Sequence, residues 1–221
     1  IYGARVSVSG EVLDKGGILI STVNSGFQSA PAVASNGVDW QVVWEENSAL
    51  GVDIHGAKVS TSGVVGGRSS LAAQLSNERS PVVAWNGAHY LLAWEDGRNA
   101  ESTGSDIYGC LVDNTGAKAS ADALISSAPG SPTSGAAGDQ ILPSVAVSPD
   151  GNWLLVWEDA RGGGKDIYGA RITDNLGALD PGGIAIGTAV SDQQAPSAAW
   201  NGGSFTVAWR DKDAGRKIRA C

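Results

Sequence analysis

A stretch of about 50 residues recurs four times along the chain, with variations, and almost nothing lies outside the pattern. Repeats of this kind constrain a fold more than any single motif does. In the clearest copy, residues 142–172 read LPSVAVSPDGNWLLVWEDARGGGKDIYGARI. The Pro-Asp-Gly at 149–151 signals a turn, 153–157 is an apolar run, and the polar, glycine-rich 159–165 signals a loop. The stretch therefore predicts three short β-strands in succession.

Three landmarks keep this period independently. An Ile-led strand (IYGARV and its variants) opens at Ile1, Ile54, Ile107, Ile167 and Ile218, with spacings of 53, 53, 60 and 51 residues. A proline opens a strand of small side chains at Pro31, Pro81, Pro143 and Pro196, and a tryptophan ends the apolar strand at Trp44, Trp94, Trp157 and Trp209. We therefore predict one domain, 1–221, with repeat units at about 1–53, 54–106, 107–166 and 167–221. The third unit is longer because 126–139, SSAPGSPTSGAAGD, is predicted to be a flexible surface insertion.

A period of about 50 residues with several short strands per unit is typical of a β-propeller. The 31 glycines, and the Asn-Gly and Asp-Gly pairs between apolar runs, favour tight turns and antiparallel strands. We predict an all-β propeller of four-stranded antiparallel blades, with four blades and closure of the ring by a terminal strand. Closure would remove the open sheet edges that invite aggregation.

The number of Ile-led strands leaves the closure open, because five such strands serve four units. Ile1–Val6 and Ile218–Cys221 compete for one position in the last blade. One of them is displaced, adds an extra edge strand, or pairs with a second copy, which would give a homo-oligomer by terminal-strand pairing. Alternatively, the sequence is part of a longer array of repeats.

The repeat also resembles known families. The segment PSVAVSPDGNWLLVWED resembles the first two strands of a WD40-type blade. The whole unit, W-E-D-x-R followed by D-I-Y-G-x-R-V, resembles repeats of large secreted bacterial proteins. The resemblance implies the propeller fold and does not imply a ligand. The WD dipeptide is missing from the third strand, so the partners of WD40 proteins are not carried over.

The composition excludes several partners. The formal net charge is -8 and the sequence pI is about 4.6, which disfavours nucleic acids because phosphate binding needs clustered Lys and Arg. No apolar run approaches the roughly 20 residues of a membrane span, so we expect no membrane insertion. A low content of Lys and Glu with abundant Ser, Gly, Ala and Asn suits a protein that is secreted or at the cell surface.

The loop after each repeated tryptophan is the strongest candidate for chemistry. Two copies supply the residues that we single out as candidate ligand contacts: Glu95, Asp96, Arg98, Glu158, Asp159 and Arg161. In a propeller these loops share one face, around the mouth of the channel, where carboxylates bind a cation or act as general acid and base. The competing interpretation is structural, since an Asp and an Arg repeated in every blade usually pair with each other.

Two tryptophans differ from the repeated ones, which we assign to the core between blades. Trp85 and Trp200 end the innermost strand in only two units, where the others have Ser35 and Val147. An aromatic ring beside a glycine turn either stacks on a sugar or a peptide, or plugs the end of the channel. We therefore include both as candidate ligand contacts.

Other chemistry finds no support in the motifs. With two Cys and two His, scattered, the chain predicts no zinc site, and there is no nucleophile elbow, H-E-x-x-H or phosphate loop. We assign no catalytic residue, no metal site and no cofactor. Cys110 and Cys221 hold the same repeat position in opposite blades, so we predict free thiols or a bridge to another molecule.

The main functional prediction is a secreted, non-catalytic and lectin-like binding module with a glycan or protein ligand, and therefore not an enzyme. One alternative is a polysaccharide-active hydrolase or lyase that uses carboxylates at the channel mouth. The other is a structural repeat segment of a larger bacterial surface protein.

Overall fold

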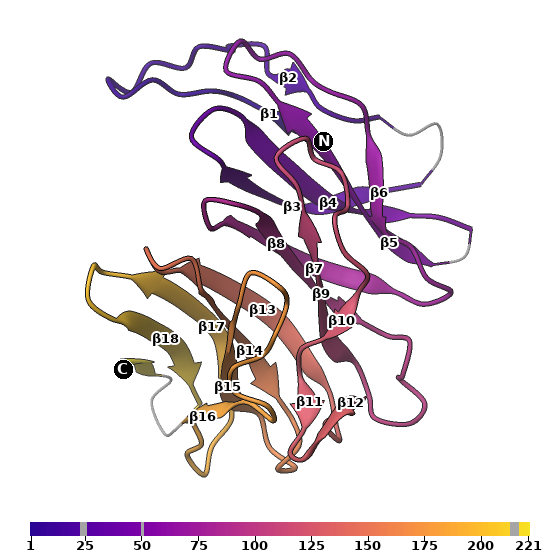
Figure 1. Ribbon diagram of the computed structural model, residues 1–221, viewed down its shortest axis with the longest axis vertical. Helices are drawn as coiled ribbons and strands as arrows, with labels where there is room; N and C mark the ends of the chain where they lie inside the picture. The colour runs from indigo at the N-terminus through magenta and orange to yellow at the C-terminus, as the bar shows by residue number, and fades with distance from the viewer. Residues whose placement is uncertain (23–25, 50, 213–216) are drawn as a thin grey trace.

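The structure, a computed structural model, describes residues 1–22, 26–49, 51–212 and 217–221. The described residues form antiparallel β-sheets joined by turns and loops (Figure 1). They include no helix that is long and apolar enough to cross a membrane. Four of the sheets follow the repeat, and we call them blades 1 to 4.

The strands of each blade follow one another in sequence and in space. Blade 1 contains β3 (Gln28–Ser35), β4 (Trp40–Asn47), β5 (Val52–Val59) and β6 (Ser69–Ala72). Blade 2 contains β7 (Glu78–Trp85), β8 (Tyr90–Asp96), β9 (Asp106–Val112) and β10 (Ala123–Leu124). Blade 3 contains β13 (Gln140–Val147), β14 (Trp153–Asp159), β15 (Asp166–Ile172) and β16 (Ile184–Gly187). Blade 4 contains β17 (Gln193–Trp200), β18 (Phe205–Asp211) and β19 (Lys217–Ala220), and two hairpins pair β1 (Tyr2–Gly3) with β2 (Ile18–Leu19) and β11 (Ser127–Ala128) with β12 (Ser131–Gly135).

The blades are arranged as in a propeller. The first strand of each blade lies innermost, and contacts join β3 to β7, β7 to β13 and β13 to β17. The remaining strands of each blade lie further from these inner strands (Figure 1). Small side chains such as Ala32, Ala34 and Ala198 allow the inner strands to approach one another. The predicted all-β, propeller-like fold is confirmed, and the number of blades in a complete ring stays a prediction.

The core lies between neighbouring blades, because each second strand is apolar on both faces. Trp94 of blade 2 packs in one cluster with Val43 and Ile54 of blade 1. Trp157 of blade 3 packs in the same way with Leu91 of blade 2. The repeated tryptophans are buried, as predicted for residues that hold blades together.

The predicted closure by a terminal strand is not what the structure shows. β1 pairs with β2 in a separate hairpin, and its residues Ile1, Ile18 and Ile20 pack on blade 1. The edge of β18 that β1 would need is already taken by β19, from Ala208↔Ala220 to Asp211↔Lys217. The two ends of the chain lie apart in Figure 1.

The segment 126–139 also differs from the prediction of a flexible insertion. It holds the β11–β12 hairpin, which turns at Gly130, where φ is 76°. Ser126, Ser127 and Ala136 are buried, because the hairpin folds back onto blade 2. A Cβ on Gly135 would lie 2.0 Å from an oxygen of Asp106, so this close approach requires glycine.

The two cysteines are free thiols. Cys110 is buried in the core between blades 1 and 2, and burial raises its pKa to about 12. Cys221 is exposed at the end of the chain. Only Cys221 is therefore accessible for reaction with another molecule.

We predict that Trp157→Ala destabilises the fold by about 3–5 kcal/mol, the usual cost of removing a large buried aromatic side chain. Trp157 is fully buried between two blades, and its Nε1 donates to Asp159 at 2.8 Å. Denaturant unfolding followed by tryptophan fluorescence measures the change. An unfolding free energy equal to that of the wild type would contradict the assignment of Trp157 to the core between blades.

Candidate functional site

The repeated Asp and Arg after each tryptophan pair with each other. In blade 2, Arg98 donates from Nε to Asp96 Oδ1 at 2.8 Å and from Nη2 to Asp96 Oδ2 at 2.6 Å. In blade 3, Arg161 holds Asp159 through the same two bonds, at 2.8 and 2.7 Å. Both carboxylates are fully buried. This forked geometry matches the structural interpretation of the repeat.

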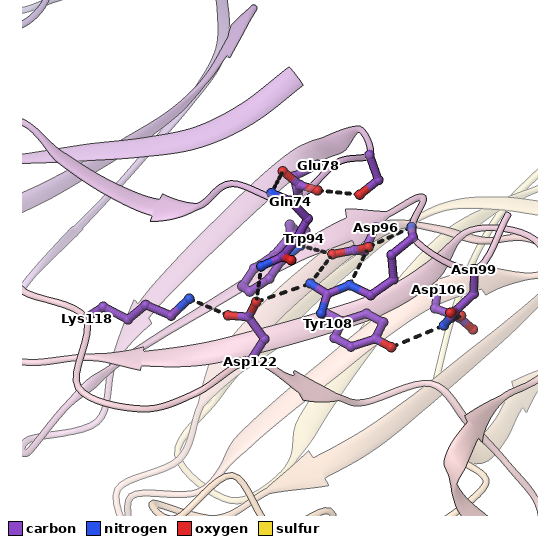
Figure 2. Close-up of polar contacts among 11 residues, drawn as sticks. Gln74, Glu78, Trp94, Asp96, Asn99, Asp106, Tyr108, Lys118 and Asp122 are labelled. Carbon is purple, nitrogen blue, oxygen red and sulfur yellow. Dashed lines mark hydrogen bonds and ion pairs between the residues drawn. The ribbon is translucent and has the colours of Figure 1, made fainter. Parts of the chain in front are cut away.

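Each pair is part of a wider scaffold. The indole Nε1 of Trp94 donates to Asp96 at 2.8 Å, and the Arg98 guanidinium lies over the Tyr108 ring, 4.0 Å from its centroid. Figure 2 shows Asp96 facing Trp94, with Tyr108 beside them and Asp122 held by Lys118. The carboxylates around Arg98 hold its pKa above the ordinary value, although burial opposes this. These contacts fix the loops at this end of the blades.

A second carboxylate, on the residue after the tryptophan, crosses to the next blade. Glu45 of blade 1 accepts a hydrogen bond from the backbone N–H of Ser80 in blade 2, at 2.7 Å. Glu158 of blade 3 accepts one from the N–H of Ala195 in blade 4, at 2.8 Å. Glu95 of blade 2 accepts the equivalent bond from Leu142 in blade 3. We call these three residues the glutamate ring.

The donors of these bonds share an unusual backbone conformation. Ser80, Leu142 and Ala195 have φ values of 52°, 52° and 53°, in the left-handed region that non-glycine residues seldom adopt. Each precedes a proline, and each lies in a bulge where the pairing of the inner strand with its neighbour shifts register. The bulge turns the N–H out of its own sheet, toward the glutamate of the preceding blade. The bond therefore compensates the strain of the bulge.

The glutamate ring surrounds the mouth of the central channel. A cavity of about 470 Å³ is lined by the residues at and around the bulges of all four inner strands, namely Ala30, Pro31, Ala32, Ser80, Pro81, Val82, Leu142, Pro143, Ala195 and Pro196. The three N–H donors are among them. The prediction that carboxylates after the tryptophans gather at the channel mouth thus agrees with this geometry.

The ring is not symmetric, and Glu95 is the exception. The second oxygen of Glu45 accepts from the Ser29 hydroxyl at 3.0 Å, and that of Glu158 is ion-paired with Lys165 at 2.7 Å. Glu95 has no ion pair with any other residue that the structure describes. Its side chain is half-buried, whereas Glu45 and Glu158 are buried. In blade 4 the position is Arg210, which bonds Gln194 instead.

The surroundings of Glu95 favour its protonated form. Burial raises the pKa of Glu95 above the ordinary value, and this is the largest effect. The charge of Arg79, opposite Glu95 in the sheet, lowers the pKa, and the charges of Asp139 and Glu45 raise it. The net direction is upward. Glu95 therefore keeps its proton to a higher pH than a solvated glutamate does.

Glu95 lines a polar cleft of about 620 Å³ in blade 2. The cleft is bounded by the loops before β7 and after β8, and its lining includes Arg79, Arg98, Asn99 and Ser105. Glu95 thus lies between this cleft and the channel cavity, since its donor Leu142 lines the latter. A volume of this size is typical of small-molecule and sugar-sized ligand sites.

Asp139 adds a second carboxylate near Glu95. It is exposed, and its Oδ1 accepts a hydrogen bond from the Ser105 N–H at 3.0 Å. A Cβ on Gly104, whose φ is +98°, would lie 2.8 Å from the same oxygen, so glycine permits this approach. One oxygen of Asp139 is thereby fixed on the rim.

The sequence analysis missed Arg79, Asp139 and Glu78. Glu78 is fully buried, accepts hydrogen bonds from Ser76 and from the Gln74 N–H, and burial raises its pKa (Figure 2). The signal was a break in the repeat, because the equivalents of Glu78 are Gln28, Gln140 and Gln193. Blade 2 therefore carries more carboxylates at this end than its neighbours, which the search for shared residues overlooked.

The predicted candidate residues do not form one site. Trp85 and Trp200 lie at the opposite end of the blades from the glutamate ring, because they pair with Tyr90 and Phe205, where β8 and β18 begin. Trp85 packs against Tyr90, with ring centroids 4.6 Å apart, and Trp200 meets Phe205 edge-on at 4.9 Å. The aromatic and the acidic candidates belong to separate faces.

Comparison with known proteins gives matches in structure alone. No known protein family and no curated protein matches the sequence. The endo-arabinase of Bacteroides thetaiotaomicron has a TM-score of 0.59 at 15% identity, covering 93% of this chain and 79% of that one. An α-L-arabinanase of Penicillium chrysogenum, complexed with arabinobiose, has a TM-score of 0.57 at 16% identity, covering 83% and 56%. An α-L-arabinofuranosidase of Podospora anserina, in complex with cellotriose, has a TM-score of 0.56 at 12% identity, covering 92% and 67%.

These neighbours correct the main functional prediction. At such identities the likeness shows a shared β-propeller fold. The solved structures that share it are glycan-cleaving enzymes, which contradicts the prediction of a non-catalytic binding module and favours the alternative of a polysaccharide-active hydrolase. The likeness to WD40 and to secreted bacterial repeats stays a prediction.

We predict that Asp159 and Arg161 are energetically coupled. Asp159→Ala and Arg161→Ala each remove the same forked pair, so the double variant should lose less stability than the two single losses combined, with a coupling of about 0.5–3 kcal/mol. Denaturant unfolding of the three variants measures the cycle. Strictly additive losses would show that the pair does not act as one unit.

Proposed function

We propose that this protein hydrolyses glycosidic bonds of a polysaccharide, with Glu95 as the general acid and Asp139 as the second carboxylate. The observation that carries the proposal is the break in symmetry at Glu95. Of the three equivalent glutamates, it alone faces a polar cleft with its second oxygen left out of an ion pair among the described residues. A catalytic group is expected to depart from a structural repeat in this way.

The proposed chemistry uses the ordinary division of labour between two carboxyl groups. One is protonated and gives its proton to the leaving oxygen, while the other is ionised and either activates water or attacks the sugar carbon. Glu95 suits the first role because burial raises its pKa. Asp139 suits the second because it is exposed and is held by the Ser105 N–H.

Two arginines suit the binding of substrate. Arg79 and Arg98 both line the cleft. Arg98 is held rigidly by Asp96 and Asp122, at 2.6 and 3.2 Å, whereas Arg79 is exposed. Arg79 is therefore the group available to donate hydrogen bonds to sugar hydroxyls. Its positive charge would also stabilise the ionised form of Glu95 after proton transfer.

The substrate class follows from the structural neighbours. The neighbours reported above are named for arabinan and arabinofuranoside cleavage, so arabinan is the first polysaccharide to test. A polysaccharide of this kind lies outside cells, and we accordingly propose that the protein is secreted or displayed at the cell surface. We propose a glycan as its partner, and no cofactor enters this scheme.

We predict that Glu95→Gln lowers kcat about 10²- to 10⁴-fold, the usual contribution of a general acid. The Gln side chain keeps an oxygen to accept the Leu142 N–H and loses only the proton. Release of reducing sugar from arabinan measures the rate. In the wild type, kcat/KM should fall as the pH rises through the pKa of Glu95, because the acid must be protonated. Asp139→Asn should also reduce the rate.

Glu158→Gln is the matched control. It changes the same repeat position in blade 3 but leaves the cleft of blade 2 intact, so the rate should stay close to that of the wild type. Equal losses in Glu95→Gln and Glu158→Gln would mean that the glutamates matter only for the fold. Absence of turnover by the wild type on arabinan, arabinoxylan and mannan would refute the proposed function.

A further inference from the structure

We propose that a groove between blades 3 and 4 is a second glycan-binding site, which takes a neutral glycan chain without cleaving it. The groove has a volume of about 500 Å³ and is lined by Ser148, Pro149, Asp150, Asn152, Arg171, Leu179, Trp200 and Phe205. The proposal goes beyond the proposed hydrolysis, because binding here uses none of the groups around Glu95.

One wall of the groove is aromatic and apolar. Trp200 and Phe205 meet edge-on with centroids 4.9 Å apart, and Leu179 lies across from them on blade 3. The edge-on contact fixes the orientation of the Trp200 indole. A fixed aromatic surface suits the C–H face of a sugar ring, which is flat, apolar and rigid.

The other wall presents polar groups that are held in place. Asn152 donates from Nδ2 to Asp150 at 2.9 Å, and the Ser148 hydroxyl also donates to Asp150. Arg171 is paired with Asp180 through bonds of 2.9 and 2.8 Å. Carboxylate oxygens, an amide and a guanidinium together offer acceptors and donors, which is what sugar hydroxyls require. The two carboxylates disfavour an acidic ligand, so we commit to a neutral glycan.

The equivalent tryptophan of blade 2 shows why the groove is specific to blades 3 and 4. Trp85 packs against the core cluster between blades 1 and 2, and its partner Tyr90 is fully buried. The next residue, Asn86, donates to the Gly151 carbonyl at 2.9 Å and to Asp174 at 3.2 Å. These bonds join the turns of blades 2 and 3. No such bond links Ser148 to the turn of blade 4 among the described residues.

The position of the groove suggests how one chain would be used at both ends. Trp200 and Phe205 lie where β18 starts, and Asp211 at its other end is level with the loops of the glutamate ring. Seven residues of β-strand span about 20 Å. A polysaccharide held in the groove would stay close to the protein while another part of the polymer meets the cleft, which raises its local concentration.

Affinity electrophoresis of the full chain tests the proposal, with linear arabinan, arabinoxylan or mannan in the native gel. Retardation by at least one of these is expected. Trp200→Ala should then weaken the apparent affinity about 2- to 10-fold, the range that corresponds to one aromatic contact. Asn152→Ala, an exposed change that leaves the core intact, should weaken it as well. Trp85→Ala is the matched control and should leave the affinity unchanged, with melting curves to verify folding of each variant.

The outcomes separate this proposal from the proposed function. Turnover of a short aryl arabinoside should be unaffected by Trp200→Ala, because the cleft lies at the other end of the blades. If the protein binds glycans through Trp200 but cleaves none, the groove stands and the hydrolase proposal fails. Unchanged affinity in both Trp200→Ala and Asn152→Ala, or retardation by none of the three polysaccharides, overturns the groove.

Discussion

The hydrogen bond from a bulged backbone N–H to a glutamate of the preceding blade determines how the blades of this protein fit together. It recurs at Ser80, Leu142 and Ala195, and each time the donor residue has a left-handed φ and precedes a proline. A strained conformation of this kind costs about 1–3 kcal/mol and persists only where its surroundings compensate it. Here the compensation comes from the neighbouring blade, so the local strain and the packing of blades depend on each other.

The same bonds bring buried or half-buried carboxylates to the channel mouth. Two of them are neutralised locally, Glu158 by Lys165 and Glu45 by hydrogen bonds from Ser29 and Ser80. Glu95 lacks such a partner, and burial raises its pKa. Because folding raises this pKa, the cost of burying Glu95 is absent at low pH and reaches its full size as the pH rises through the folded-state pKa. A residue that lowers stability at neutral pH within an otherwise satisfied repeat is a good candidate for function.

Much of this structure could be predicted from the sequence, because the repeat carries it. The period gave the strands, and the tryptophans gave the core between blades. The pairing of Asp159 with Arg161 was also expected from their recurrence in each unit. Closure by Ile1–Val6 failed because β19 occupies the edge of β18, a competition that spacing alone does not decide. The hairpin in 126–139 was missed because its Ser, Pro and Gly content is typical of flexible loops.

The candidate site was harder to predict, because it rests on differences between repeats. Glu95 looks like Glu45 and Glu158 in the sequence, and only the contacts of the second oxygen separate them. Asp139 lies in the longer third unit and meets Glu95 only after folding. The functional prediction failed for a related reason: the alikeness of the blades favoured a symmetric binding module, whereas the structure shows one junction unlike the others.

The most direct test of this account is the pKa of Glu95, measured by NMR titration of its side-chain carboxyl carbon in the folded protein. We predict a midpoint above the ordinary glutamate value of about 4.3, because burial outweighs the opposing effects of Arg79 and the Leu142 N–H. A midpoint at or below the ordinary value would contradict the claim that Glu95 is the one glutamate of the ring suited to act as an acid.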